Sequence, residues 1–182
     1  MRKVVLSEYV TVDGVMEAPN EWSFQFWNDE LAKFKYDELF ASDALLLGRV
    51  TYQGFAAAWP TMEGTGEFGE RMISLPKYVA STTLTETEWN ATLIEGDAAE
   101  AVAVLKQQDG QDILIGGSAD LAQTLMQHNL IDEYRLMVYP IIVGKGKRLF
   151  KEGIDAATLT LMDTKTTSTG VVILTYQPAA RP

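Results

Sequence analysis

The amino-acid sequence predicts a three-layer α/β/α fold, with helices on both faces of a mixed, mostly parallel sheet of about eight strands. Three observations support this prediction. Short apolar runs alternate with segments in which apolar residues recur at helical spacing, which is typical of βαβ units. Two of these runs end at glycines, where a strand can turn sharply into a helix. The last two runs alternate apolar and polar residues around Gly170, which predicts a C-terminal antiparallel hairpin.

The length and composition are those of one globular domain. The chain has 182 residues, of which 47% are hydrophobic, and this is enough for a sizeable core. We expect a single domain over residues 1–177 and a frayed tail over residues 178–182. The chain contains no cysteine, and His128 is its one histidine. A disulfide framework and a histidine-rich metal site are therefore excluded, and no metal is predicted.

The charge and the N-terminus limit the possible partners. A formal net charge of −10 argues against a nucleic-acid surface, which needs clustered Lys and Arg. The first apolar run is broken by Ser7 and Glu8, and no stretch reaches membrane length, so we expect a cytoplasmic protein without membrane contact. A small anionic cofactor needs a local basic pocket. Arg49 and residues 145–148 supply basic groups beside glycines, unless they are ordinary solvated surface charge.

The first elements are a strand, an irregular loop and a helix. Residues 3–12 are rich in valine and predict a largely apolar strand. Asp13-Gly14 then favours a tight turn into a segment of the kind that forms substrate loops. A helix is expected to begin between residues 20 and 28 and to end near Ala41.

This helix carries a candidate proton donor. Trp27, Leu31 and Phe34 recur at helical spacing and predict its buried stripe, and Glu30 lies on the same side. A carboxyl group beside aromatic rings is partly desolvated, which raises its pKa and suits it to donate a proton near neutrality. Glu38 is a weaker candidate of the same kind. Alternatively, Glu30 lies at the edge of the stripe and reaches water.

Two further strands end in residues that can bind phosphate. Residues 44–47 form an apolar run that ends at Gly48, after which Arg49 can pair with a phosphate and Thr51 can cap a helix. The strand at residues 77–80 ends in a group of hydroxyl side chains that either bind a phosphate or satisfy a turn. A short strand over 91–94 and a helix opened by Asp97, with Glu100 in capping position, follow.

The segment from Asp112 to Leu121 has the strongest pattern for ligand binding. Its apolar run stops at Gly116-Gly117 and restarts with helical spacing. The glycines let a ligand approach the backbone, and the following helix offers free N–H groups and a positive dipole end to an anion. Alternatively, the glycines serve only the geometry of the turn. The remaining strands are expected over residues 134–142, 158–165 and 171–176.

The turns, taken in order, resemble the dihydrofolate reductase-like superfamily, and more closely its riboflavin biosynthesis reductase (RibD) C-terminal domain branch. The resemblance covers nearly the whole chain and implies an NADPH-dependent reductase, usually a homodimer, that uses no metal. In such relatives the paired glycines, here Gly116 and Gly117, are commonly joined by a cis peptide, which would mark a functional site under strain if it is present in this chain. The motifs that carry the resemblance are Thr11–Gly14, Ala44–Tyr52, Ser81–Thr82, Ile115–Ser118 and Pro140–Phe150.

The resemblance also implies which residues meet the cofactor. Some would border the nicotinamide, others would bind its phosphates, and two hydroxyl residues would lie at the adenosine 2′-phosphate. The expected cofactor-binding set is Tyr9, Val12 and Met16 at the nicotinamide, Gly48, Arg49, Val50, Thr51, Gly117, Ser118 and Ala119 at the phosphates, Ser81 and Thr82 at the 2′-phosphate, and Ile115, Gly116 and Leu121 along the central turn.

The resemblance implies hydride transfer to a small heterocycle. The helix that carries Glu30 is similar to the one that carries the substrate-binding acid in dihydrofolate reductases, and Asp13 is the second candidate acid. The expected reaction is reduction of a C=N or C=O group in a pterin-like or 5-amino-6-(5-phosphoribosylamino)uracil-like substrate. A departure from the family is Asp120, whose charge would repel phosphate unless it points away. The alternative function is a non-catalytic module that binds or senses a dinucleotide.

Overall fold

The computed structural model describes residues 1–180 and contains one eight-stranded sheet, in the order β4-β3-β2-β5-β1-β6-β8-β7. Neighbouring strands from β4 to β6 are parallel, and β8 runs antiparallel to both β6 and β7. The predicted fold class is confirmed. The strands are β1 (Val4–Thr11), β2 (Ser42–Gly48), β3 (Lys77–Ala80), β4 (Ala91–Ile94), β5 (Asp112–Gly116), β6 (Glu133–Tyr139), β7 (Leu159–Thr166) and β8 (Val172–Pro178).

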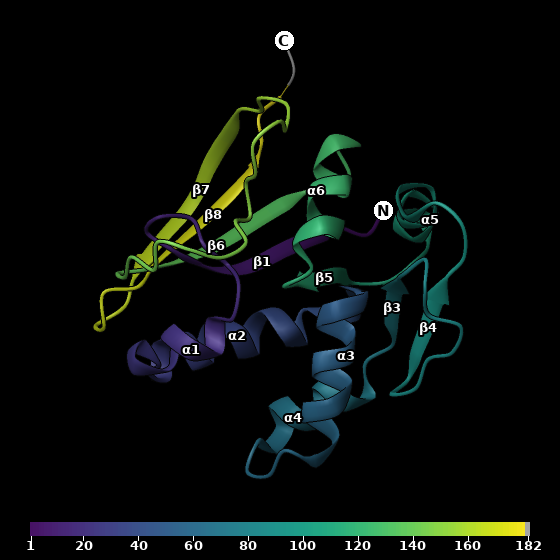
Figure 1. The fold of residues 1–182 in the computed structure, drawn as a ribbon, viewed down its shortest axis with the longest axis horizontal. Coiled ribbons are helices and arrows are strands. Elements are labelled where there is room, and N and C mark those ends of the chain that lie inside the picture. The colour runs from purple at the N-terminus through teal and green to yellow at the C-terminus, as the bar shows by residue number, and fades with distance from the viewer. Residues whose placement is uncertain (181–182) are drawn as a thin grey trace.

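Helices cover both faces of this sheet (Figure 1). One face packs against α5 and α6 through an apolar cluster that includes Leu6, Val102 and Leu125. The opposite face is covered by α2, α3 and α4 through clusters that include Leu39 and Tyr52. The helices are α1 (Pro19–Trp22), α2 (Asp29–Phe40), α3 (Arg49–Ala58), α4 (Gly66–Ser74), α5 (Ala98–Gln107) and α6 (Ala119–Gln127), with short 3-10 turns η1 (Phe24–Phe26) and η2 (Trp59–Thr61).

Side-chain caps explain where two of the helices begin. Asn28 accepts a hydrogen bond from the Leu31 N–H at 3.0 Å and starts α2, within the predicted limits. Asp97 accepts from the Glu100 N–H at 2.9 Å and starts α5, as predicted. Both caps satisfy N–H groups that a helix leaves free in its first turn.

The C-terminal end is more ordered than the sequence suggests. Pro178 lies in β8, and the Ala179 N–H donates to the Thr158 carbonyl at 2.9 Å, so the expected frayed tail does not begin at residue 178. The last two residues of that tail, 181 and 182, lie outside the described part of the chain. None of the helices within residues 1–180 has the length and apolar character needed to cross a membrane.

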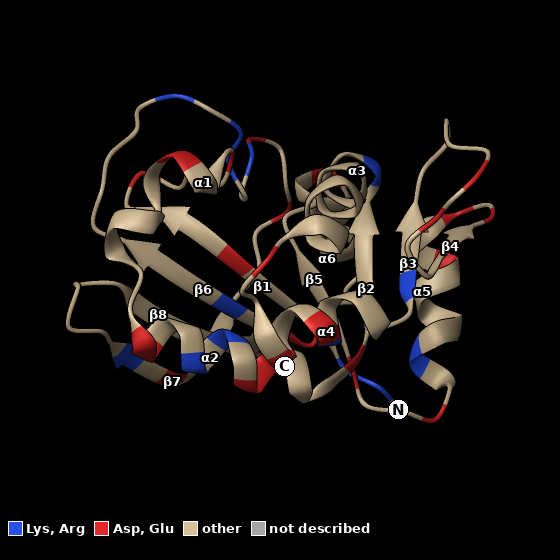
Figure 2. Ribbon diagram, turned by 90° about the horizontal axis from the view of Figure 1, so that it is seen from below, with Lys and Arg blue, Asp and Glu red and all other residues tan. Residues whose placement is uncertain are grey.

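The central strands do not end at the same level of the sheet, and this leaves an open edge at which the candidate site lies. Pairing between β1 and β5 stops at Ser7 and Gly116, whereas pairing between β1 and β6 continues to Thr11 and Tyr139. β1 and β6 therefore run on together past the end of β5 (Figure 2). The second half of β1 has no strand on its β5 side. Ligands of open α/β sheets bind at such carboxyl ends, where neighbouring chains diverge.

Candidate functional site

The turns after β2 and β5 are joined by hydrogen bonds. The Gly48 N–H donates to Ser118 Oγ at 2.9 Å, and the Ser118 N–H donates to Thr51 Oγ1 at 2.9 Å. Ser118 Oγ in turn donates to the Gly116 carbonyl at 3.1 Å. These bonds hold the N-terminal ends of α3 and α6 side by side at the carboxyl edge of the sheet.

The two turns approach so closely that Gly117 has no room for a side chain. A Cβ atom on Gly117 would lie 2.8 Å from Thr51 Oγ1, and the residue has a φ of +59°. The next residue, Ser118, is also left-handed, with φ 61° and ψ 46°. Glycine adopts such angles without strain, and the absent side chain exposes the backbone of the turn.

Both helices present uncapped N-terminal N–H groups at this junction. Gly48 has no side chain to cap α3, and Ser118 makes no side-chain cap to α6. Free N–H groups and the positive ends of two helix dipoles therefore converge on one place, which is a physical basis for binding an anion. The arrangement brings together the predicted phosphate-binding residues of the two turns.

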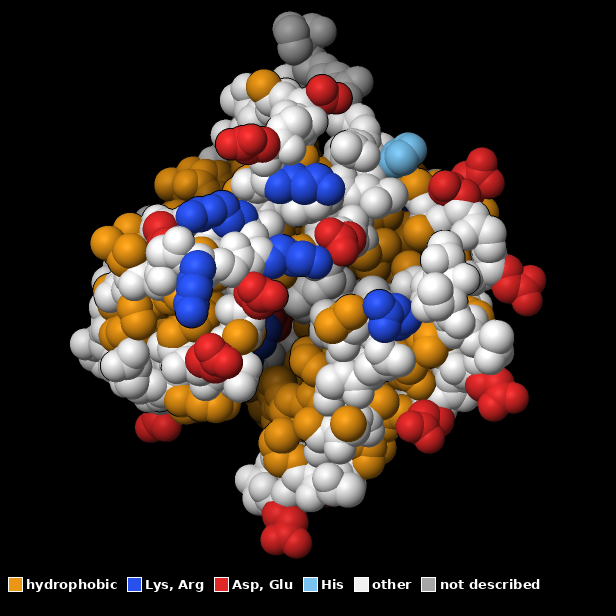
Figure 3. Space-filling model, in the orientation of Figure 1, with side chains coloured by type: hydrophobic (Ala, Val, Ile, Leu, Met, Phe, Trp, Pro, Cys, Tyr) orange, Lys and Arg blue, Asp and Glu red, His pale blue; other side chains and the backbone are white. Residues whose placement is uncertain are grey.

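The charge of Asp120 in the first turn of α6 is compensated. Its carboxylate lies 3.1 Å from the Lys147 ammonium, and both side chains are at least half exposed. Lys and Arg side chains also gather on the face of the molecule seen in Figure 3, although the chain is acidic as a whole. Repulsion of a phosphate by Asp120 is therefore weakened by a partner that the sequence separates from it by 27 residues.

Arg49, predicted at the phosphates, and the two hydroxyl residues predicted at the 2′-phosphate differ in how free they are to bind a ligand. The exposed Arg49 donates from Nη1 to Gln53 Oε1 at 3.1 Å, a contact that leaves the rest of its guanidinium free for a ligand. Ser81 Oγ accepts from the N–H groups of Thr83 and Leu84 at 3.2 and 3.0 Å, so this hydroxyl satisfies a turn. Thr82 is exposed beside it.

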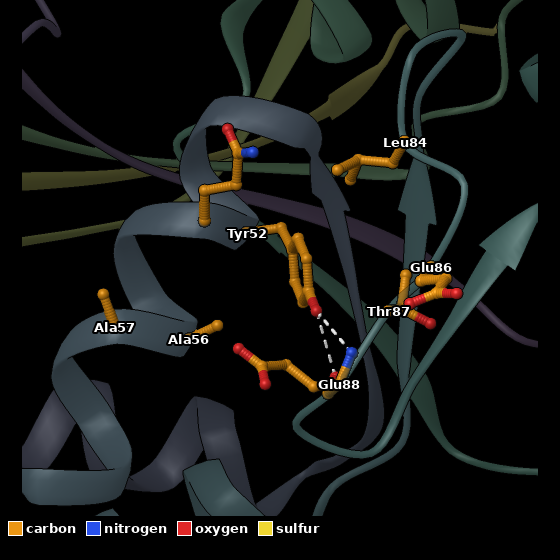
Figure 4. A pocket seen from close by; sticks show the side chains of 8 residues that line it. Tyr52, Ala56, Ala57, Leu84, Glu86, Thr87 and Glu88 are labelled. Atoms are coloured by element: carbon orange, nitrogen blue, oxygen red, sulfur yellow. Dashed lines mark hydrogen bonds between the residues drawn. The ribbon is translucent and has the colours of Figure 1, made fainter.

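A cavity of about 350 Å³ lies between α3 and the loop that connects β3 to β4 (Figure 4). The Tyr52 hydroxyl accepts from the Glu88 N–H at 2.8 Å and donates to the Glu88 carbonyl at 3.1 Å, which fixes this loop to α3. The cavity is lined by none of the predicted cofactor residues, and its two carboxylates do not suit a phosphate. Its lining residues are Tyr52, Gln53, Ala56, Ala57, Leu84, Glu86, Thr87 and Glu88.

The expectation of a raised pKa for Glu30 is wrong. The exposed carboxylate accepts from the Ser168 N–H at 2.7 Å, from Ser168 Oγ at 2.9 Å and from Asn28 Nδ2 at 2.8 Å. The bonds from Ser168, followed by that from Asn28, lower the pKa of Glu30. The side chain turns toward the β7–β8 connection, where its bonds to Ser168 favour the anion.

Asp13 is likewise unsuited to give up a proton near neutrality. Its carboxylate accepts from the Thr11 hydroxyl at 2.5 Å and from the N–H groups of Gly144 and Val143 at 2.8 and 3.3 Å. The Thr11 bond and then the Gly144 bond lower the pKa of Asp13 to about 2. Asp13 ties the turn after β1 to the loop after β6, which is a structural role.

The residues expected at the nicotinamide do not share one surface. The Tyr9 ring faces α2, where it lies 5.5 Å from the Tyr139 ring and 5.4 Å from Lys35 Nζ. Met16 is buried on the opposite side of the sheet, in the same cluster as Leu121, and Val12 is 61% exposed. The remaining predicted residues are Ile115 and Ala119, which are buried, and Val50, which is exposed.

Sequence reasoning missed Glu8 as a site residue. Its carboxyl is buried in β1, where Oε2 accepts from the Gly117 N–H at 3.0 Å and Oε1 has no hydrogen-bond partner among the described residues. Burial raises the pKa of Glu8 well above its ordinary value. The signal was present in the sequence, because strand alternation places Glu8 in line with the apolar residues Val4, Leu6 and Val10.

A second buried carboxylate belongs to a charge network beneath α2. Glu38 pairs with Lys35, accepts from Ser7 Oγ at 2.8 Å and lies 3.5 Å from Arg135 Nη1. Burial opposes the charge of Lys35, yet the Glu38 carboxylate raises the pKa of Lys35 above its ordinary value. Glu38, the weaker candidate acid on this helix, is thus occupied by two cations and holds α2 to β1 and β6.

The sheet order and the paired turns define a dihydrofolate reductase-like α/β fold, of the class found in reductases. The chain belongs to the RibD C-terminal domain family, whose model matches residues 2–173. No cis peptide occurs within residues 1–180, so Gly116 and Gly117 are joined in trans, unlike the cis peptide that is common in relatives.

Two curated relatives come from Bacillus subtilis (strain 168). The uncharacterized protein YyaP is 33% identical over 181 residues, which cover 96% of this chain and 94% of the relative. The uncharacterized protein YwjB is 30% identical over 168 residues, covering 90% and 91%. Both similarities extend over nearly the full length of the domain.

Solved structures show the same fold. A putative riboflavin biosynthesis protein from Shewanella sp. PV-4 has a TM-score of 0.80 at 21% identity, with 99% of this chain and 100% of that chain covered. Dihydrofolate reductase from Enterococcus faecalis, solved with NADP(H), has a TM-score of 0.68 at 15% identity, with 98% and 97% covered.

Proposed function

We propose that the chain is an NADPH-dependent oxidoreductase that reduces a C=N or C=O group in a small heterocycle, either pterin-like or 5-amino-6-(5-phosphoribosylamino)uracil-like. The observation that carries this proposal is the convergence of two uncapped helix N-termini at the carboxyl edge of the sheet. The similar dihydrofolate reductase from Enterococcus faecalis was solved with NADP(H). A nicotinamide cofactor supplies a hydride when it is bound.

The residues present fit a dinucleotide. The backbones of residues 48–51 and 117–119 would hold the diphosphate, because no side chain caps the first turn of α3 or α6 and Gly117 leaves the backbone bare. The open edge of β1 after Ser7 would border the nicotinamide. The buried side chains of Met16 and Leu121 lie on one side of this edge and would keep water away from it.

Dinucleotide binding is tested by thermal denaturation with NADPH, with NADH and without ligand. A ligand held only by the native state stabilises it by mass action, and we expect NADPH at one hundred times its Kd to raise the Tm by roughly 5–10 °C. NADH should give a smaller rise at the same concentration. Absence of a shift with either dinucleotide would contradict the proposed cofactor.

Arg49 is expected to decide the preference for NADPH. Replacing Arg49 with alanine removes a cation beside the α3 N-terminus and should weaken NADPH binding by about tenfold, the loss of one charge-assisted hydrogen bond. Binding of NADH should change little. Isothermal titration of both dinucleotides checks this, with Gln53→Ala as the control, because that variant removes the guanidinium's partner and keeps its charge. Equal weakening of both dinucleotides would assign the 2′-phosphate to other groups.

A non-catalytic dinucleotide-binding or sensing module is the alternative function. The lowered pKa values of Glu30 and Asp13 favour it, because neither predicted acid is a proton donor near neutrality. The two functions are separated by incubating the protein with NADPH and candidate pterins or ribosylated pyrimidines. Oxidation of NADPH, measured as a loss of its absorbance, indicates the reductase, whereas a binding module leaves the absorbance unchanged.

We further propose, from the family likeness, that the protein is a cytoplasmic homodimer. Sedimentation equilibrium tests the dimer.

A further inference from the structure

We propose that Glu8 is a positioning residue that couples proton binding to dinucleotide binding. In its neutral form the Glu8 carboxyl holds the Gly117 turn in place and adds no negative charge next to the phosphate site. When Glu8 loses its proton, the dinucleotide binds more weakly. This inference rests on the proposed function. It concerns a residue outside the predicted cofactor-binding set.

The geometry links Glu8 directly to the phosphate-binding turn. Glu8 is the first residue of β1 beyond the last pair with β5, so its side chain enters the space that β5 leaves. There Oε2 accepts from the Gly117 N–H at 3.0 Å. The next residue, Ser118, bonds to both Gly48 and Thr51. One carboxyl group thus fixes the start of α6 and, through Ser118, its contact with α3.

The surroundings of Glu8 disfavour its charged form. The side chain is buried, and Oε1 has no hydrogen-bond partner among residues 1–180. The titratable groups that act on it are Lys35 and Glu38 of α2 and the Tyr9 phenol beside it. Lys35 is already paired with Glu38, so its charge is largely compensated. An ionised Glu8 would be a buried charge with a single hydrogen bond, which is costly.

A bound phosphate and an ionised Glu8 would both lie at the positive end of the α6 dipole, where their negative charges repel each other. The N-terminus of α6 attracts either negative charge, and a carboxylate bonded to the Gly117 N–H would lie at this end of the helix. The phosphates therefore favour the neutral acid. Because the coupling is reciprocal, binding of the dinucleotide takes up a proton at any pH at which Glu8 of the free protein is partly ionised.

The experiment is isothermal titration of NADPH at several pH values, in pairs of buffers that differ in ionisation enthalpy. For the wild type we expect proton uptake on binding and a Kd that rises roughly 5- to 10-fold between about pH 6 and about pH 9. Glu8→Gln keeps an acceptor for the Gly117 N–H and has no charge. At every pH, this variant should bind NADPH with the affinity that the wild type has at low pH. The rise in Kd that the ionisation of Glu8 causes in the wild type should be absent.

Glu133→Gln is the matched control, since it removes another buried carboxylate, one that pairs with Arg135 on β6 and does not touch Gly117. It should keep the pH dependence of the wild type. The proposal is overturned if the wild-type Kd is independent of pH, if Glu8→Gln shows the wild-type dependence, or if Glu8→Gln fails to bind at every pH. Failure of the wild type to bind at any pH would instead overturn the proposed function.

A second measurement tests Glu8 without any cofactor. A carboxyl whose pKa is raised in the folded state contributes stability below its unfolded pKa and loses it as pH rises through the folded value. Glu8→Gln should therefore gain stability relative to the wild type as pH rises from about 5 to about 9. Urea denaturation of both proteins measures this difference. A constant difference across the range would overturn the claim that burial in the folded state raises the pKa of Glu8.

Discussion

Glu38→Ala is expected to lower the free energy of unfolding by about 3–5 kcal/mol, the usual cost of removing one partner from a buried ion pair. The Glu38 side chain is 1% exposed, and the side chains of Lys35 and Arg135 are 17% and 18% exposed. Both cations would remain largely buried without their shared carboxylate. The Ser7 hydroxyl would also lose its acceptor.

Urea denaturation of the cofactor-free protein measures this loss. Asp37→Ala is the control, because Asp37 precedes Glu38 on the same helix and pairs with Lys33 at 2.5 Å on the surface. Exposed pairs of this kind contribute about 0.3–0.5 kcal/mol. If Glu38→Ala costs no more than Asp37→Ala, the network beneath α2 does not stabilise the fold.

Gly117→Ala is expected to abolish dinucleotide binding and to destabilise the protein by about 1–3 kcal/mol, the cost of a left-handed backbone at a residue with a side chain. Its Cβ atom would lie 2.8 Å from Thr51 Oγ1, within the contact that joins the two turns. To relieve this clash, either the Thr51 side chain must turn away and lose its bond from the Ser118 N–H, or α3 and α6 must move apart. The free N–H groups would then no longer converge on one ligand.

Gly54→Ala is the matched control for this substitution. Gly54 lies within α3, and a Cβ atom there would meet nothing within 4 Å. Alanine should stabilise the helix by about 0.5–1 kcal/mol and leave binding unchanged. Isothermal titration with NADPH and urea denaturation compare the two variants. Binding of NADPH by Gly117→Ala with wild-type affinity would show that the close approach of the turns is not required.

The fold could be predicted because its signals are local. The apolar run before Gly48 and the run before Gly116-Gly117 mark parallel strands that turn into helices, and both occur where expected. Asn28 limits the start of α2 because a cap acts on N–H groups only a few residues away. Strand alternation around Gly170 likewise predicts the hairpin from neighbouring residues.

The chemistry of the site depends on partners far away in the sequence, and spacing along a helix does not reveal them. Helical periodicity placed Glu30 beside the apolar stripe, but its hydrogen-bond partner, Ser168, is 138 residues away. The alternation of β1 places Glu8 on the buried side. Its bond to Gly117 follows only from the register of β1 with β5, which the sequence does not show.

The position of β1 in the sheet affects the order in which the protein can fold during synthesis. β1 is made first, yet its two neighbours, β5 and β6, begin at Asp112 and Glu133. Until these segments leave the ribosome, the apolar Val4–Leu6 segment has no partner strand, whereas β2, β3 and β4 can already pair. Nascent chains with such late-closing contacts expose apolar surface and are prone to aggregate. A fragment that ends before Asp112 therefore lacks both neighbours of β1 and cannot form the complete eight-stranded sheet.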